Sequence, residues 1–78
     1  MVERFFGIMR KSEVEIEKRF KDNNGYIITI QANKHGWTII YADGGCRYND
    51  IDESSDNNFN TAYRIAEDEL GKLIPYNS

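Results

Sequence analysis

Apolar residues alternate with polar ones along three stretches in the first two thirds of the chain. Val14, Ile16 and Phe20 are separated by mostly charged residues, and the segments at residues 26–30 and 37–41 are rich in β-branched and aromatic side chains. A period of two is typical of a strand that buries one of its faces. The pattern therefore predicts three strands, one in each stretch.

Turn-forming residues separate these predicted strands. An Asn-Gly pair at residues 24–25 supplies the positive φ that a hairpin turn needs, and further turns are predicted at residues 33–36 and 43–45. Their spacing of roughly ten residues is typical of an antiparallel meander. A short fourth strand is expected at an edge over residues 46–48. Residues 12–15 also resemble a capping box that opens a helix; we favour a strand there, because the Asn-Gly turn then joins two strands of similar length.

The last third of the chain changes to a helical period. Apolar residues recur there every three or four positions: Phe59, Ala62, Tyr63, Ala66, Leu70 and Leu73. This stripe predicts a helix over residues 57–71 that docks on one face of the sheet. Gly71 is a natural C-terminal cap and Pro75 prevents the helix from continuing. Three preceding polar residues are candidate N-terminal caps: Asp56, Asn57 and Asn58.

Together these elements predict an α+β fold. We expect an antiparallel meander of three to four strands with one C-terminal helix packed on a face. The core should form where the apolar faces of the strands meet the apolar stripe of the helix. Its predicted members are Val14, Ile16, Ile28, Ile30, Trp37, Ile39, Tyr41, Ala62, Tyr63, Ala66 and Leu70.

Length and composition limit the class of protein. The chain has 78 residues, of which 40% are hydrophobic, so we expect a single domain over residues 1–78. Ten Lys and Arg against thirteen Asp and Glu give a net charge of −3, which excludes a nucleic-acid binder held by summed positive charge. One cysteine, Cys46, excludes an internal disulfide framework.

The first ten residues allow three interpretations. Val2, Phe5, Phe6 and Met9 suit a short helix, an additional strand or an apolar arm that binds another molecule. Residues 1–7 lack the long apolar region of a signal peptide, and no apolar run approaches the ~20 residues that cross a bilayer. We therefore expect a cytoplasmic protein without a membrane partner.

The few residues that could carry chemistry do not form a catalytic pattern. His35 lies in one predicted turn and Cys46 just after the next, so a meander would place them at opposite ends and apart from each other. Alternating acids from Asp50 onward invite a calcium-loop interpretation, but Ser55 and Thr61 stand where an EF-hand needs Gly and Glu. We expect no enzyme, no cofactor and no metal site.

Charge is distributed unevenly along the chain. Residues 1–36 carry seven Lys and Arg against five Asp and Glu, a balance of +2, whereas residues 37–78 carry three against eight, a balance of −5. Negative potential attracts basic surfaces and speeds their association. The candidate partner-binding residues are the five acids around the predicted start of the helix: Asp43, Asp50, Asp52, Glu53 and Asp56. Solubility and favourable charge at the helix N-terminus are the alternative explanation.

Aromatic residues near basic ones suggest a second surface. Three aromatic residues, Trp37, Tyr41 and Tyr48, lie on predicted strands near Lys34 and Arg47, and such a mixture on a sheet can stack single-stranded bases. Trp37 shares the parity of Ile39 and therefore belongs to the core if the helix covers that face.

A local pattern resembles a known family. Residues 37–46 combine a β-rich strand with a Gly-Cys turn, and an alanine-bearing helix follows. This arrangement is similar to that of HicB-type antitoxins. The resemblance implies a partial RNase-H-like sheet with a helix, and a small basic ribonuclease toxin as the partner.

A broader likeness concerns small phage or mobile-element proteins that inhibit host defence, such as anti-CRISPR proteins. The chain is similar to that class in being small, acidic and poor in motifs, with an asparagine-rich stretch at residues 56–60. Such proteins commonly occlude a nucleic-acid site or a subunit interface.

These observations lead to one main functional prediction and two alternatives. We expect a non-enzymatic protein-binding module that inhibits a basic, nucleic-acid-handling partner. The alternatives are a HicB-like antitoxin and a single-stranded nucleic-acid-binding domain that uses Lys34, Trp37, Arg47 and Tyr48. Because a core below ~80 residues rarely supplies more than ~3–5 kcal/mol, a homodimer through an edge strand or through Phe5 and Phe6 is also expected to be feasible.

Overall fold

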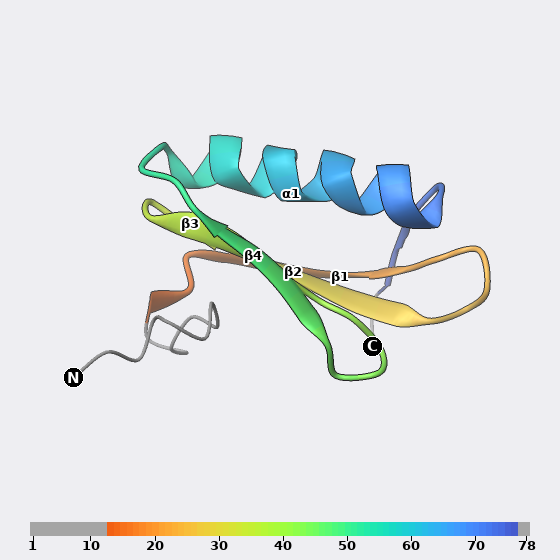
Figure 1. Ribbon diagram of the computed structural model, residues 1–78. Coiled ribbons are helices and arrows are strands. Elements are labelled where there is room, and N and C mark those ends of the chain that lie inside the picture. The colour runs from red at the N-terminus through yellow and green to blue at the C-terminus, as the bar shows by residue number, and fades with distance from the viewer. Residues whose placement is uncertain (1–12, 77–78) are drawn as a thin grey trace.

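The computed structural model describes residues 13–76, which form a five-stranded antiparallel sheet with one helix lying across one face (Figure 1). The spatial order of the strands is β4-β3-β2-β1-β5. This arrangement confirms the predicted α+β fold, with one strand more than the three to four expected. The elements are β1 (Ile16–Lys21), β2 (Ile27–Asn33), β3 (Gly36–Ile40), β4 (Cys46–Asp50), α1 (Ser55–Leu70) and β5 (Ile74–Pro75).

Local turn chemistry sets the register of the first hairpin. The Oδ1 atom of Asp22 accepts the backbone N–H groups of Asn24 and Tyr26, both at 2.9 Å, and Gly25 takes a φ of 87°. The turn pairs β1 with β2 from Lys21 opposite Ile27 outward. A polar side chain that hydrogen-bonds the backbone two residues on is a common way to close such a turn. The predicted Asn-Gly turn is therefore confirmed.

Register then decides which side chains lie beneath the helix. Residues opposite each other on neighbouring strands point to the same face, and Ile30 lies opposite Ile39 while Ala32 lies opposite Trp37. All four are buried, together with Ala62 of α1. Small alanines on the helix allow its backbone to approach the sheet closely, so the aliphatic side chains fill the layer between them.

Most of the predicted core is confirmed. The buried cluster contains Ile28, Ile30, Trp37, Ile39, Ala62 and Ala66, with Tyr41, Tyr63 and Leu70 packed partly buried against it. The expectation for Val14 and Ile16 is wrong, because both are only half-buried and lie outside the cluster. The helix lies mainly over β2 and β3 and contacts β1 less. Three residues not on the predicted list complete the cluster: Phe20, Ala32 and Leu73.

The helix begins earlier than its apolar stripe indicated. Ser54 is the N-terminal cap, and its side chain accepts the N–H of Asn57 at 3.1 Å. The predicted caps at positions 56–58 are therefore wrong, since the helix already includes them. Gly71 ends the helix as predicted, with a φ of 83° and its N–H donated to the carbonyl of Glu67 at 2.8 Å.

The additional strand, β5, follows the helix at the outer edge of β1. Ile74 pairs with Lys21 and Pro75 with Phe20, and the N–H of Tyr76 reaches the carbonyl of Arg19 at 2.9 Å. Proline is tolerated at a sheet edge because its missing N–H is not needed there. Two residues are too few to produce a periodic signal, so the sequence pattern did not predict this strand.

Two predictions fall on residues outside the described range. The helix, strand or arm interpretations of residues 1–10 belong there, as does Ser12 of the alternative capping box. Between residues 13 and 76, no helix has the length and apolar character needed to cross a membrane.

Gly36 provides a test of how tightly the sheet is closed at the β2–β3 turn. A Cβ atom at this position would lie 2.3 Å from the carbonyl oxygen of Asn49 and 3.1 Å from the Cα of Asp50. Both atoms belong to the backbone of β4 and cannot rotate away.

Gly36→Ala should lower the free energy of unfolding by about 2–3 kcal/mol, measured by urea denaturation. Gly25→Ala is the control: it shares a positive φ but meets nothing within 4 Å, and should lose only about 1 kcal/mol. Equal losses would contradict the close approach.

Candidate functional site

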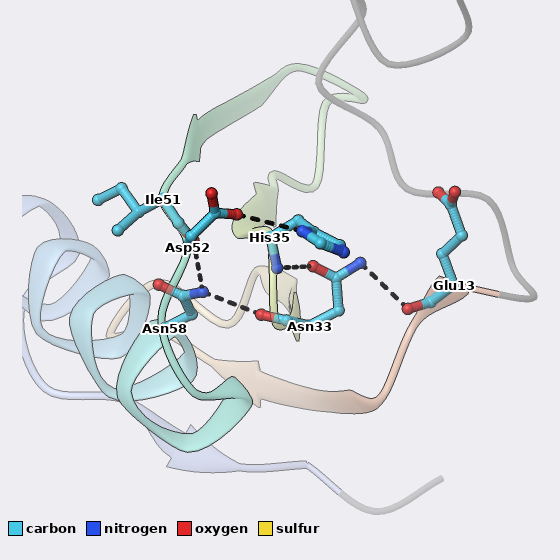
Figure 2. A network of polar contacts seen from close by, with 6 residues as sticks. All are labelled: Glu13, Asn33, His35, Ile51, Asp52 and Asn58. Atoms are coloured by element: carbon cyan, nitrogen blue, oxygen red, sulfur yellow. Dashed lines mark hydrogen bonds and ion pairs between the residues drawn. The ribbon is translucent and has the colours of Figure 1, made fainter.

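Two buried asparagines form hydrogen bonds at one end of the sheet. Asn58, in the first turns of α1, is 1% exposed, and Asn33, at the end of β2, is 5% exposed. The Nδ2 group of Asn58 donates to the carbonyl of Asn33 at 2.9 Å and to that of Ile51 at 3.0 Å. Figure 2 shows how this amide lies between the turn and the loop. Buried polar groups require such partners, so the amide fixes the helix to both segments.

The side chain of Asn33 extends the network to the beginning of β1. Its Nδ2 group donates to the carbonyl of Glu13 at 3.1 Å, and its Oδ1 atom accepts the backbone N–H of His35 at 2.7 Å (Figure 2). One asparagine therefore links the segment before β1 to the β2–β3 turn, while its own carbonyl is bound to Asn58. Three segments that are distant in sequence meet at these two amides: the residues before β1, the β2–β3 turn, and the stretch from the β4–α1 loop into α1.

Backbone hydrogen bonds hold the loop between β4 and α1 against the β2–β3 turn. The N–H of Ile51 donates to the carbonyl of His35 at 2.9 Å, and that of Glu53 to the carbonyl of Lys34 at 3.2 Å. His35 Nδ1 also lies 3.1 Å from Asp52 Oδ1, but the two side chains are 60% and 89% exposed. An exposed ion pair contributes little, so the backbone bonds and Asn58 fix this loop.

The structure brings together four of the five predicted partner-binding acids. Asp50 ends β4, Asp52 and Glu53 lie in the following loop, and Asp56 occupies the first turn of α1. Asp43 is not among them: it lies in the β3–β4 turn, at the opposite end of β4 (Figure 1). There its Oδ1 atom accepts the N–H of Gly45 at 2.9 Å.

Two further acids join the four from the beginning of the chain. The backbone of Glu13 is bound by Asn33, and a carboxylate oxygen of Glu15 accepts the hydroxyl of Ser55. Their spatial neighbours lie up to 40 residues away, so the linear charge pattern did not reveal them. The hairpin register could have done so, because it places residues before Ile16 beyond Ala32. We call the resulting set the acidic end: Glu13, Glu15, Asp50, Asp52, Glu53 and Asp56.

The acidic end carries a concentrated negative charge. In the segments that form it, residues 13–16, 33–36 and 50–56, six carboxylates against the ammonium group of Lys34 leave −5 when His35 is neutral. The positive end of the helix dipole lies beside Asp56 and offsets part of their repulsion. A shallow hollow of about 550 Å³ lies within this surface, lined by Lys34, His35, Asp52, Glu53, Ser54 and Ser55.

The other candidate residues are not brought together. Cys46 starts β4 opposite Ile40, whereas His35 lies at the far end of that strand, so the two are separated as predicted. Across residues 13–76, no three His, Cys, Asp or Glu side chains are grouped as metal ligands.

The predicted nucleic-acid surface is also dispersed. Trp37 is 3% exposed beneath the helix, so its assignment to base stacking is wrong and its core alternative is correct. Arg47 lies on the helix side of β4 and is paired with Glu69, whereas Tyr48 points to the opposite face because strand neighbours alternate. Lys34 lies at the acidic end.

Comparison of the chain with protein-family models, curated proteins and solved structures finds no match. The likeness to HicB-type antitoxins and to anti-CRISPR proteins therefore stays a prediction.

A second polar cluster joins the helix to β3 and β4. The hydroxyl of Tyr41 donates to Oε1 of Glu69 at 2.5 Å, while the guanidinium of Arg47 pairs with the other oxygen of the same carboxylate. Burial, together with this hydrogen bond and the charge of Glu69, raises the pKa of Tyr41 from 10.0 to about 12. The neutral phenol is thus the form that the fold favours.

This pKa has a direct consequence for stability in alkali. A folded-state pKa above the unfolded value means that the Tyr41 contribution is complete below about pH 10 and is lost as the pH rises toward 12. Absorbance titration of tyrosinate should show a late transition in the wild type that Tyr41→Phe removes. Tyr63, whose pKa is raised by burial and by Glu67, should keep its own late transition in the variant. A titration unchanged by Tyr41→Phe would contradict the assignment.

Asn58 should be the most sensitive polar residue of this site. Asn58→Ala removes both hydrogen bonds and leaves a buried carbonyl, of Asn33, and a partly buried one, of Ile51, without their donor, so we expect a loss of about 2–4 kcal/mol in the free energy of unfolding. Asn60→Ala, two positions further along α1 and exposed, should change it by less than about 0.5 kcal/mol. Chemical denaturation of both variants measures the difference. Similar small effects would show that the network does not hold the loop.

Proposed function

We propose that this protein is a non-enzymatic binding module that inhibits a nucleic-acid-handling partner by docking its acidic end on the partner's basic surface. The observation that carries the proposal is the convergence of six acidic residues from two separate segments, 13–15 and 50–56, on one end of the sheet. A surface of this sign attracts a groove that normally binds phosphates and competes with nucleic acid for it.

The rigidity of the acidic end supports this proposal. Asn58 and the backbone bonds of Ile51 and Glu53 hold the loop before any partner arrives. Groups that are already ordered lose less conformational entropy on binding, which favours affinity. Charge complementarity contributes mainly to the association rate and to the choice of partner. A small basic toxin, as the likeness to HicB-type antitoxins implies, would be one partner of this kind.

The proposal is tested with two variants that change the net charge equally. Asp52→Asn with Glu53→Gln removes two charges from the acidic end, and Asp43→Asn with Asp68→Asn removes two exposed charges elsewhere. Wild-type and variant proteins are immobilised, and the proteins they capture from lysates of the source cells are identified and compared. Surface plasmon resonance then measures the association of each captured protein.

We expect the acidic-end variant to bind more slowly, on the order of tenfold, and the control to bind nearly as the wild type does. A single-stranded oligonucleotide should release the captured partner by competing for its basic surface. Equal binding by both variants, or a partner that the oligonucleotide does not release, would contradict the proposal.

A further inference from the structure

A separate groove runs between the helix and the outer strands. Phe59, Asn60 and Tyr63 line it from α1, and Lys18 and Arg19 line it from β1. Its volume is about 870 Å³, within the range of about 300–1,000 Å³ that is usual for small-molecule sites. The groove forms because the helix covers β2 and β3 and leaves the outer part of the sheet less covered.

Aromatic rings form one wall of this groove. The rings of Phe59 and Tyr63 lie at an interplanar angle of 18° with centroids 6.5 Å apart, and the buried ring of Phe20 packs against both. Phe59 and Tyr63 are themselves only half-buried. Their spacing of four residues on α1 aligns them along one side of the helix, where a flat ring system can stack on them.

The ammonium group of a lysine lies in the same groove. The ammonium of Lys18 lies 5.4 Å from the centroid of Phe59, on the helix side of β1, because Lys18 lies opposite the buried Ile30. Arg19 also lines the groove, but its side chain points to the other face of the sheet because strand neighbours alternate. The opposing carboxylate among the lining residues, Glu17, accepts a hydrogen bond from Gln31 at 2.9 Å. Positive charge beside exposed aromatic surface is the combination that binds a phosphate and a base together.

We propose that this groove binds a nucleotide unit, either free or within a single strand. Lys18 contacts the phosphate, the Phe59 and Tyr63 rings stack the base, and the Asn60 amide can both donate to and accept from the edge of the base. Each chemical part of the ligand thus has a matching group. The inference does not depend on the proposed function, because no residue of the groove belongs to the acidic end.

Fluorescence anisotropy with a labelled oligothymidylate tests this inference, with thymidine monophosphate and an oligoglutamate peptide as competitors. Lys18→Gln removes the ammonium group from the groove. Lys72→Gln removes one exposed charge outside it and is the matched control. Phe59→Leu keeps an apolar side chain but removes the ring, and far-ultraviolet circular dichroism verifies that each variant is folded.

We expect salt-sensitive binding of the oligonucleotide that falls by about tenfold in Lys18→Gln and by less than about twofold in the control. Phe59→Leu should also weaken binding. Efficient competition by the mononucleotide identifies a free nucleotide as sufficient, and competition by longer strands alone identifies a strand as the ligand. Absence of binding, equal losses in the two charge variants, or equal competition by oligoglutamate would overturn the proposal.

Discussion

The amide of Asn58 is the contact on which the arrangement of this protein depends most. It donates to one carbonyl at the end of β2 and to another in the loop after β4. Among the described residues, no other side chain of the helix is hydrogen-bonded to these two carbonyls. Because the amide is buried, water cannot replace these bonds when they break. The helix, the turn and the loop are therefore fixed relative to one another, and the charges they carry are fixed with them.

This constraint separates two surfaces of opposite character on a small scaffold. The acidic end collects its charges where the loop, the β2–β3 turn and the start of β1 meet, while Lys18 and Lys21 lie along β1, each over an aromatic ring. The net charge of −3 conceals this division. For the binding role proposed above, the placement of charge, rather than its total, determines which partners the protein meets.

Local patterns predicted most of the fold. The Asn-Gly turn, the strand alternation and the helical stripe each depend on neighbours in sequence, and the structure contains all three elements. The failures concern long-range contacts. The strand at Pro75 was not predicted, because it depends on pairing with β1. Asn58 was interpreted as an N-terminal cap, although it lies inside the helix and is hydrogen-bonded to Asn33. Glu15 was missed for the same reason, since only the folded chain brings it to Ser55.

Amide hydrogen exchange at the loop tests the central claim most directly, because it reports whether the acidic end is ordered without a partner. The backbone N–H groups of Ile51 and Glu53 donate to carbonyls of the β2–β3 turn. If the loop is held as described, both amides should exchange as slowly as those inside β2 and β3 in the isolated protein. Exchange at the rate of an unstructured peptide, with the strands still protected, would show that the carboxylates have no fixed arrangement.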